Sequence, residues 1–252
     1  KVRTRYDEGR LNAALLQLES ALALAGPPLR IECYDISTFH GAFSVGSMVV
    51  FTNGRAEPAA YRRFRVRMDT PSANDVAMMG EVLRRRFAPD RLADGRFGSR
   101  PDLVIVDGGI PQLRAARAAL EAVGSTDIAV VALAKREEEL YVGWQDAPVV
   151  LPVGAPSLYL IKRVRDEAHR FAVTYHRELR GKAMTASILD EIPGVGPKRK
   201  KALVRAFGSV RRLAEADVDA VASTPGIPRE VAEDIVKTLR ALRSAPDGHS
   251  SL

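Results

Sequence analysis

The sequence of 252 residues predicts an α/β domain with a mixed five-stranded sheet and flanking helices, followed by a smaller all-α domain. Three observations support this prediction. Three β-type segments follow one another, with a hairpin turn signal before the third. Two short apolar runs then enclose a helical stretch. After about residue 186 the chain changes to short helices separated by Pro-Gly turns.

The composition is that of a globular protein whose expected partner is a polyanion. A hydrophobic content of 46% with 27% charged residues excludes the disordered and membrane classes. The 38 Lys and Arg exceed the 31 Asp and Glu, giving a formal charge of +7, which favours nucleic acid, although such charge also serves solubility alone. The single cysteine, Cys33, excludes a disulfide framework and a multi-cysteine zinc site, and it indicates a reducing, cytoplasmic compartment.

No window approaches the roughly 20 apolar residues of a membrane-spanning helix, so no membrane partner is expected. The chain starts at Lys1 without a Met or an apolar signal core. We therefore expect it to be part of a longer protein.

The first third of the chain predicts a helix and three strands. Residues 1–27 are expected to form an N-terminal helix and a linker that ends at Gly26-Pro27-Pro28. Three segments have strand composition: 29–36, 42–51 and 61–66. The dipeptide Asn53-Gly54 predicts a hairpin between the second and third strands, so the three should form an antiparallel meander.

The middle of the chain predicts helices and parallel strands. Helical periodicity over 75–87 is followed by two apolar runs, 102–107 and 128–134, with a helical stretch between them. Such a βαβ unit has parallel strands that are buried on both faces. Two short β runs within 139–151 and a long amphipathic helix over 156–179 complete the order of a ribonuclease H-like α/β domain, which we place at residues 28–185.

Residues 186–243 predict a tandem helix-hairpin-helix domain. Pro193 and Pro225, 32 residues apart, each begin a Pro-Gly turn followed by an amphipathic helix, which indicates an internal duplication. Glycine lets the backbone approach a ligand, and the next helix start can bind phosphate, so such hairpins bind the DNA backbone without reading sequence. The expected DNA-binding residues are Gly194, Gly196, Lys198, Arg199, Lys200, Lys201 and Gly226.

The alternative for either copy is that the Pro-Gly pair simply ends a helix, and in the second copy Pro228 lacks an N–H to donate. Residues 244–252 are expected to be a disordered tail.

Two aspartates stand at strand positions where α/β proteins place their sites. Asp35 lies inside the first strand, and Asp107 ends the first parallel strand. Because these strands are neighbours in a ribonuclease H-like sheet, the two carboxylates could share one cation, although either one alone could be an edge residue or a helix cap. Gly108-Gly109 would let a phosphate or a metal approach Asp107, and they also suit an ordinary strand-to-helix turn.

The remaining candidates are weaker when each is taken alone. His169 lies one step from the apolar stripe of the long helix, where a lone histidine is usually structural. Asp75 could equally be a first-turn acid favoured by the helix dipole. His40 falls in a predicted turn and His176 in a polar stretch.

Six ordered segments at compatible spacing resemble the C-terminal half of the UvrC (excinuclease) family, the dual-incision nucleases of bacterial nucleotide excision repair. The segments are IECYDIS (31–37), SMVVF (47–51), YRRF (61–64), VIVDGG (104–109), RDEAH (165–169) and IPGVG (192–196).

This resemblance implies a metal-dependent DNA endonuclease that makes the incision on the 5′ side of a lesion. The family binds its catalytic metal with an Asp-Asp-His set, which falls on Asp35, Asp107 and His169, and a further acidic position falls on Asp75. Two oxygen ligands suit Mg²⁺ or Mn²⁺, and an imidazole favours Mn²⁺, although His169 could instead be a general acid or base.

The partners implied by the resemblance are double-stranded DNA with a lesion or a duplex/single-strand junction, and the damage-loading helicase-like subunit of the same repair system. That subunit is expected to contact mainly the region upstream of this chain.

The sequence departs from the family pattern in three loops. Thr38-Phe39-His40-Gly41 replaces the usual His-Thr-Gln-Gly, Ile110-Pro111 replaces Lys-Gly, and Asn74 replaces the first residue of a common Asp-Asp pair. The altered loops leave open a second function, a catalytically silent scaffold that binds junction DNA for other proteins. A nucleotide-binding α/β protein is the weakest alternative, because neither a P-loop nor a G-x-G-x-x-G after a strand is present.

Overall fold

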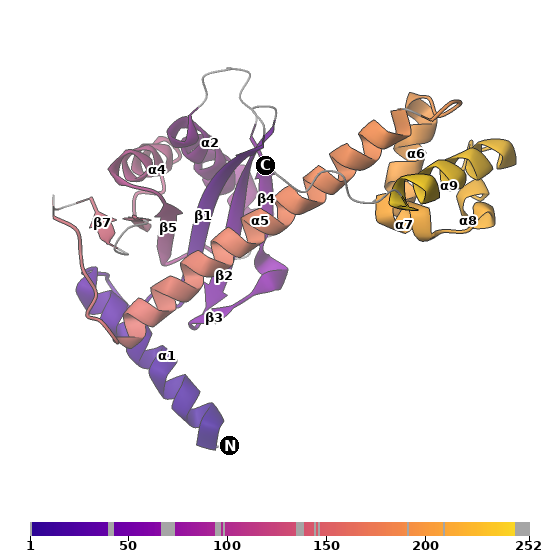
Figure 1. Cartoon of the computed structure of the whole chain (residues 1–252). Coiled ribbons are helices and arrows are strands. Elements are labelled where there is room, and N and C mark those ends of the chain that lie inside the picture. The colour runs from indigo at the N-terminus through magenta and orange to yellow at the C-terminus, as the bar shows by residue number, and fades with distance from the viewer. Residues whose placement is uncertain are drawn as a thin grey trace. The chain divides into compact units, whose positions relative to one another are not determined.

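The chain divides into two compact units, Lys1–Val173 and Thr174–Leu252. The computed structural model (Figure 1) describes residues 2–39, 43–66, 74–93, 97, 99–134, 139–143, 145, 147–190, 192–208 and 210–244. No helix in these ranges is both long enough and apolar enough to cross a membrane. The predicted tail, beyond its first residue Ser244, lies outside the described residues, as does His40.

The first unit is built on a mixed sheet with strand order β3-β2-β1-β5-β6-β7, in which β4 also pairs with β2. The strands are β1 (Arg30–Phe39), β2 (Phe43–Thr52), β3 (Arg55–Ala56), β4 (Arg62–Arg65), β5 (Leu103–Asp107), β6 (Ala129–Leu133) and β7 (Leu140–Val142). The predicted meander is confirmed, since β2 pairs antiparallel with both β1 and β4. The predicted parallel strands are also confirmed, since β5 pairs in parallel with β1 and β6.

Within the described ranges the sheet has seven strands rather than five, because β3 and β7 extend it. The predicted turn at Asn53-Gly54 is confirmed: both residues have positive φ, 50° and 72°, and they join Thr52 to its partner Arg55. This hairpin leads into the two-residue β3, and a short 3-10 turn at Pro58–Ala60 then brings the chain to β4. A two-residue strand is too short to show a periodic pattern, so the sequence did not reveal β3.

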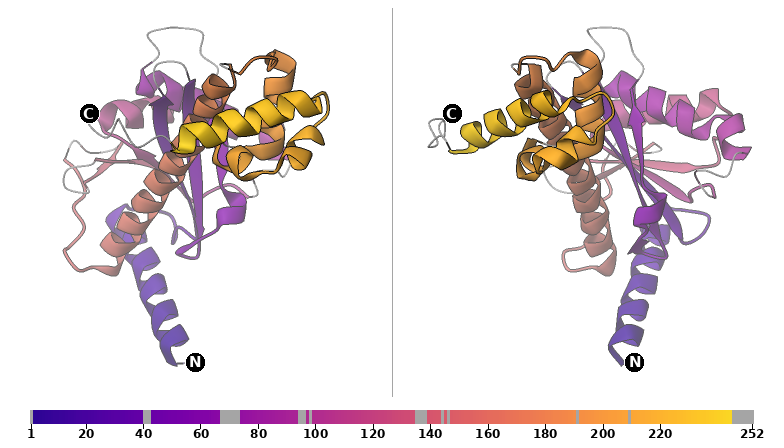
Figure 2. Two further views of the ribbon diagram at one scale, coloured as in Figure 1. Left: turned by 45° about the vertical axis from the view of Figure 1, so that its right-hand side comes forward. Right: turned by 90° about the vertical axis from the view of Figure 1, so that its right-hand side faces the viewer.

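Helices cover both faces of the sheet (Figures 1 and 2). α2 (Asp75–Phe87) and α4 (Ile110–Ala122) lie on one face, with the short α3 (Pro89–Ala93) after α2, whereas α5 (Pro156–Asp190) runs across the other face. α1 (Val2–Ala21) contributes Ala14, Leu15 and Leu18 to the core, and its Gln17 side chain accepts a 3.1 Å hydrogen bond from the Ser157 backbone.

A buried ion pair joins β1 to α2. The side chains of Glu32 and Arg86 are both fully buried, and Arg86 donates to the two carboxylate oxygens at 2.8 and 3.2 Å. The Tyr34 hydroxyl donates to the same carboxylate at 2.6 Å, and Arg30 donates to it at 3.2 Å. Burial and the Glu32 charge raise the pKa of Tyr34, so its hydroxyl remains a donor. Sequence periodicity gives no signal for this cluster, because its partners are 54 residues apart.

The second unit contains α6 (Pro197–Phe207), α7 (Val210–Glu215), α8 (Val218–Ala222) and α9 (Arg229–Ser244). The predicted duplication is confirmed by geometry that repeats at the same offset. Gly194 and Gly226 both have positive φ, 79° and 85°. The turn at Ile192 closes with a 3.1 Å backbone hydrogen bond from Val195, and the turn at Thr224 closes in the same way from Ile227. One small core, which includes Leu203, Leu213, Val221, Ile235 and Leu239, holds the helices together.

The ion pair generates the first prediction. Replacing Arg86 with Met leaves the Glu32 charge buried without its main partner, so we expect the free energy of unfolding to fall by about 3–5 kcal/mol. Chemical denaturation followed by circular dichroism measures this change. Arg84→Met, at an exposed position of the same helix, is the matched control and should change stability little. A loss below about 1 kcal/mol for Arg86→Met would show that the pair does not anchor the helix.

Candidate active site

Asp35 and Asp107 lie side by side on adjacent parallel strands. The register pairs Tyr34 with Val106, so the next positions along β1 and β5 are the two aspartates. Neighbouring strands are about 4.8 Å apart, which brings the two Cα atoms to within about 5 Å in this register. Parallel neighbours in register point to the same face, so both carboxylates project from the same side of the sheet.

Alternation along β1 identifies that side. Glu32 and Tyr34 point toward α2, as their contact with Arg86 shows, so Cys33 and Asp35 point to the opposite face. Asp35 is 8% exposed and Cys33 is fully buried. Burial raises the pKa of the Cys33 thiol, and the charges of Asp107 and Asp35 raise it further. Both carboxylates are therefore within electrostatic reach of one thiol.

The same face carries a row of polar residues across four strands. β2 places Ser47 opposite Asp35, and β4 places Arg63 opposite Ser47. The row therefore reads Arg63, Ser47, Asp35 and Asp107. Sequence patterns identified only the two aspartates. Ser47 and Arg63 could have been found from strand register, but register depends on pairing that one strand alone does not reveal.

The donor set of this row fits a divalent cation. Two carboxylates offer the hard oxygen ligands that Mg²⁺ and Mn²⁺ prefer. Beside them the Ser47 hydroxyl is completely buried, and it makes no hydrogen bond to any residue that the structure describes. Buried hydroxyls are normally satisfied, so the position suits a water bound beside a hydrated cation.

His169 lies on α5, over the same face, and its side chain is exposed. Glu167 and Phe171 on that helix face β4: Tyr61 donates to Glu167 at 2.9 Å, and the ring centroids of Tyr61 and Phe171 are 5.2 Å apart. At 3.6 residues per turn, His169 lies across the buried stripe from these two residues, on the side of α5 away from Tyr61. The structure thus brings His169 to the face of the two aspartates, but the described residues contain no cluster of three or more metal-ligating side chains.

Asp75 is not part of the row. It is an exposed residue in the first turn of α2, which packs on the opposite face of the sheet. Asn74 before it is the N-cap, and its side chain accepts a 2.9 Å hydrogen bond from the Ala77 backbone. The departure from the family's Asp-Asp pair at Asn74 is therefore explained by the N-cap hydrogen bond that this side chain accepts. The histidine side chain at 176 lies outside the described residues.

Gly108-Gly109 form a strand-to-helix turn. Gly108 has a φ of 153°, and a Cβ there would come within 2.7 Å of the Gln112 side chain. Gly109 caps α4 and donates to the Gln112 side chain at 3.1 Å, while Pro111 occupies the first turn, where proline is favoured. The two glycines therefore form a strand-to-helix turn directly after Asp107.

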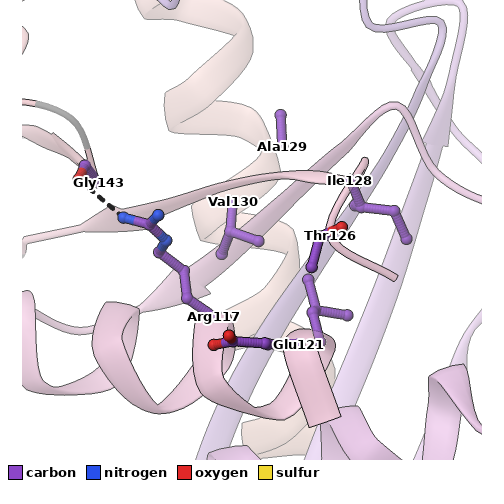
Figure 3. A pocket seen from close by; sticks show the side chains of 8 residues that line it. Arg117, Glu121, Thr126, Ile128, Ala129, Val130 and Gly143 are labelled. Atoms are coloured by element: carbon purple, nitrogen blue, oxygen red, sulfur yellow. Dashed lines mark hydrogen bonds between the residues drawn. The ribbon is translucent and has the colours of Figure 1, made fainter. Parts of the chain in front are cut away.

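A separate pocket of about 380 Å³ lies between α4 and the start of β6. Figure 3 shows Arg117 at its wall, donating to the Gly143 carbonyl at 2.7 Å. Its β6 residues Ala129 and Val130 are at the opposite end of the strand from Leu133, the partner of Asp107. The pocket is therefore remote from the row.

The two hairpins of the second unit differ in charge and in hydrogen bonding. In the first, Lys198 and Lys201 are exposed at the start of α6. Arg199 instead donates to the Gly194 carbonyl at 2.7 Å and to the Gly226 carbonyl at 2.9 Å, so it holds the two turns together. In the second hairpin Arg229 forms an ion pair with Asp219 at 2.8 Å and approaches Glu233 at 3.4 Å.

Burial of the only cysteine generates the second prediction. Because Cys33 is buried and its thiol pKa is raised, we expect the native chain to resist a thiol reagent at about pH 8 and to react once it is unfolded. Colorimetric thiol titration with and without denaturant measures this difference. Ser20→Cys, which adds an exposed thiol on α1, is the control and should react in the native state. Rapid modification of native wild-type protein would contradict the buried environment described beside Asp35.

Both units match known protein families. The family model described as the UvrC RNase H endonuclease domain matches residues 19–173, and a helix-hairpin-helix tandem matches residues 186–241. The chain is 47% identical over 251 residues to UvrABC system protein C of Thermobifida fusca, covering 91% of this chain and 38% of that protein. It is also 47% identical over 254 residues to UvrABC system protein C of Mycolicibacterium paratuberculosis, covering 95% and 39%.

Among solved structures, Ciona intestinalis endonuclease V in complex with DNA matches with a TM-score of 0.35 and 13% identity, covering 63% of this chain and 68% of that one. The chain spans about two fifths of the length of the curated relatives. The match of the endonuclease-domain model to more than half of the chain, together with the tandem hairpins, shows that the chain belongs to the UvrC family.

Proposed function

We propose that the chain is a divalent-metal-dependent DNA endonuclease of nucleotide excision repair, which hydrolyses a phosphodiester on the 5′ side of a lesion. The observation that carries the proposal is the adjacent pair Asp35 and Asp107, projecting from one face of a sheet that matches the UvrC endonuclease domain. The row also contains a buried hydroxyl, Ser47, which suits a bound water.

In the proposed mechanism Asp35 and Asp107 would hold Mn²⁺ or Mg²⁺, and His169 would serve as a third ligand or as a general acid or base. Such a cation, when bound, polarises the scissile phosphoryl group and lowers the pKa of an attacking water. The strands β1 and β5 fix the two carboxylates, because both are central in the sheet. The imidazole of His169 is exposed, so it is accessible to a bound substrate.

The second unit provides the proposed DNA-binding surface. The first hairpin offers Gly194 and Gly196 at its turn and lysines at the start of α6, whereas the cation of the second hairpin, Arg229, is engaged by carboxylates. We therefore assign most of the phosphate contact to the first hairpin. The proposed substrate is lesion-bearing or junction DNA, delivered by the damage-loading helicase-like subunit of the same system.

The carboxylates generate the third prediction. Asp35→Ala and Asp107→Ala should each abolish cleavage of a lesion-bearing duplex in the presence of Mn²⁺, while DNA affinity stays nearly unchanged, because metal ligands act in the chemical step. His169→Ala should be similarly damaging. Cleavage is measured in the assembled repair system, and affinity by fluorescence anisotropy.

The matched control is Asp127→Ala, which removes an exposed carboxylate paired with Arg100 and should cut normally. Cleavage at the wild-type rate by either active-site variant would end the assignment. If wild-type protein binds DNA but does not cleave it whichever divalent cation is added, the chain is a scaffold. A His169→Ala variant that loses thermal stability but retains activity would make that histidine structural.

The hairpins generate the fourth prediction. Replacing Lys198 and Lys200 with Glu should lower DNA affinity by at least about tenfold, because each change removes a phosphate contact and adds repulsion. Arg229→Glu should have a much smaller effect, since its charge is already engaged by Asp219. Titrations at one salt concentration give the ranking. The reverse order would refute the assigned division between the hairpins.

A further inference from the structure

A groove lined mainly by arginines lies along β4 in the first unit. Its volume is about 550 Å³. It is lined by Arg62, Arg63, Phe64, Arg65, Arg85, Arg91 and Phe97. Five of these seven residues carry a permanent positive charge, so the groove offers a concentrated set of guanidinium donors.

The fold explains how these side chains meet. Among the described strands β4 pairs only with β2, so alternate residues of this strand project to both faces beside an edge of the sheet. The rings of Phe64 and Phe97 stack with centroids 5.7 Å apart and nearly parallel planes, which gives the groove an apolar base. Arg85 lies 5.4 Å from the Phe64 ring and donates to the Arg65 carbonyl at 3.0 Å.

The lining of the groove is cationic, since no Asp or Glu is among the described residues that line it. Two carboxylates of the described residues flank it: Arg85 forms a 2.9 Å ion pair with Glu81, and Arg91 approaches Asp90 at 3.8 Å. Guanidinium groups match the two oxygens of a phosphate, and they are the preferred protein donors to nucleic-acid backbones. Surface arginines that only aid solubility need not converge on a groove with an aromatic base.

The groove shares one residue, Arg63, with the row of the candidate active site. Arg63 lies in register with Ser47, and Ser47 with Asp35, so two strand spacings, about 10 Å, separate the Cα atoms of Arg63 and Asp35. The Arg63 guanidinium lies 4.5 Å from the ring of Phe171, two residues beyond His169 on α5. One lining residue is thus shared between the groove and the face that carries the two aspartates.

We propose that this groove binds the phosphodiester backbone of the DNA strand that is cut, as a second DNA contact in addition to the hairpins. The inference rests on the proposed function, because it gives the strand a path to Asp35 and Asp107. Contacts to the backbone alone carry no base specificity, which suits cleavage at a position set by a lesion rather than by sequence.

The test isolates the groove from the hairpins in the full chain. Lys198→Glu with Lys200→Glu provides a background with weakened hairpin binding. In that background we compare Arg65→Glu with Arg91→Glu, and we leave Arg62 and Arg85 intact because their side chains donate to backbone carbonyls. Binding of a fluorescent single-stranded oligonucleotide is measured by anisotropy at several salt concentrations.

Each variant should lower affinity by about tenfold, and the log-log salt slope should fall by about 0.7 for each phosphate that is no longer bound. Arg114→Glu, an exposed arginine on α4 outside the groove, has the same charge change and should have little effect. Arg65→Lys should retain part of the affinity, because it keeps the charge but loses the planar fork. Thermal melting verifies that all variants are folded.

Unchanged affinity and salt slope in Arg65→Glu and Arg91→Glu would overturn the proposal, as would an equal loss in Arg114→Glu. Competition with inorganic phosphate shows whether the ligand of the groove is the DNA backbone or free phosphate. If a low concentration of free phosphate displaces the oligonucleotide from protein with intact groove arginines but not from the groove variants, the groove is a small-anion site. The proposal is then wrong. The proposed function has a distinct failure, namely groove-dependent DNA binding by wild-type protein that never cleaves.

Discussion

The parallel pairing of β1 with β5 is the constraint on which the rest of the first unit depends. It brings Asp107 beside Asp35, and it fixes the direction in which every residue of β1 points. A shift of β1 by one residue would turn Asp35 toward α2 and Glu32 toward α5. The shift would therefore break both the buried ion pair and the candidate active site. A site of two acids thus requires a strand whose register is strongly held.

A cluster of hydrogen bonds and charges on the opposite face of β1 fixes its register. Glu32 is surrounded by Arg86, Tyr34 and Arg30, all within hydrogen-bond distance. A half-satisfied cluster of buried charges would be costly, so its partners specify one position of α2 against the sheet. The face with Asp35 and Asp107 concentrates like charge instead: burial raises the pKa of the Cys33 thiol, and the charges of the two aspartates raise it further. Opposite charges therefore meet on one side of the strand and like charges on the other, where a cation would reduce the repulsion.

Local patterns predicted the elements well and the side-chain clusters poorly. The meander, the turn at Asn53-Gly54 and the duplicated hairpins were predictable, because glycine chemistry and hydrophobic periodicity are local signals. Asp35 and Asp107 were predictable as neighbours once the order of strands was assumed. The pair Glu32–Arg86 and the arginine groove were not, since each joins side chains from distant elements. Asp75 illustrates the converse: a first-turn acid remained as plausible as a ligand, and the structure shows it exposed on α2.

The central claim is that Asp35 and Asp107 together bind one divalent cation, and calorimetric titration with Mn²⁺ tests it most directly. We expect wild-type protein to bind, and Asp35→Asn, Asp107→Asn and the double variant to lose affinity to a similar extent, because a shared site fails when either ligand is removed. Asp127→Asn should bind as wild type does. Wild-type affinity in either single variant, or losses that simply add in the double variant, would contradict a shared site.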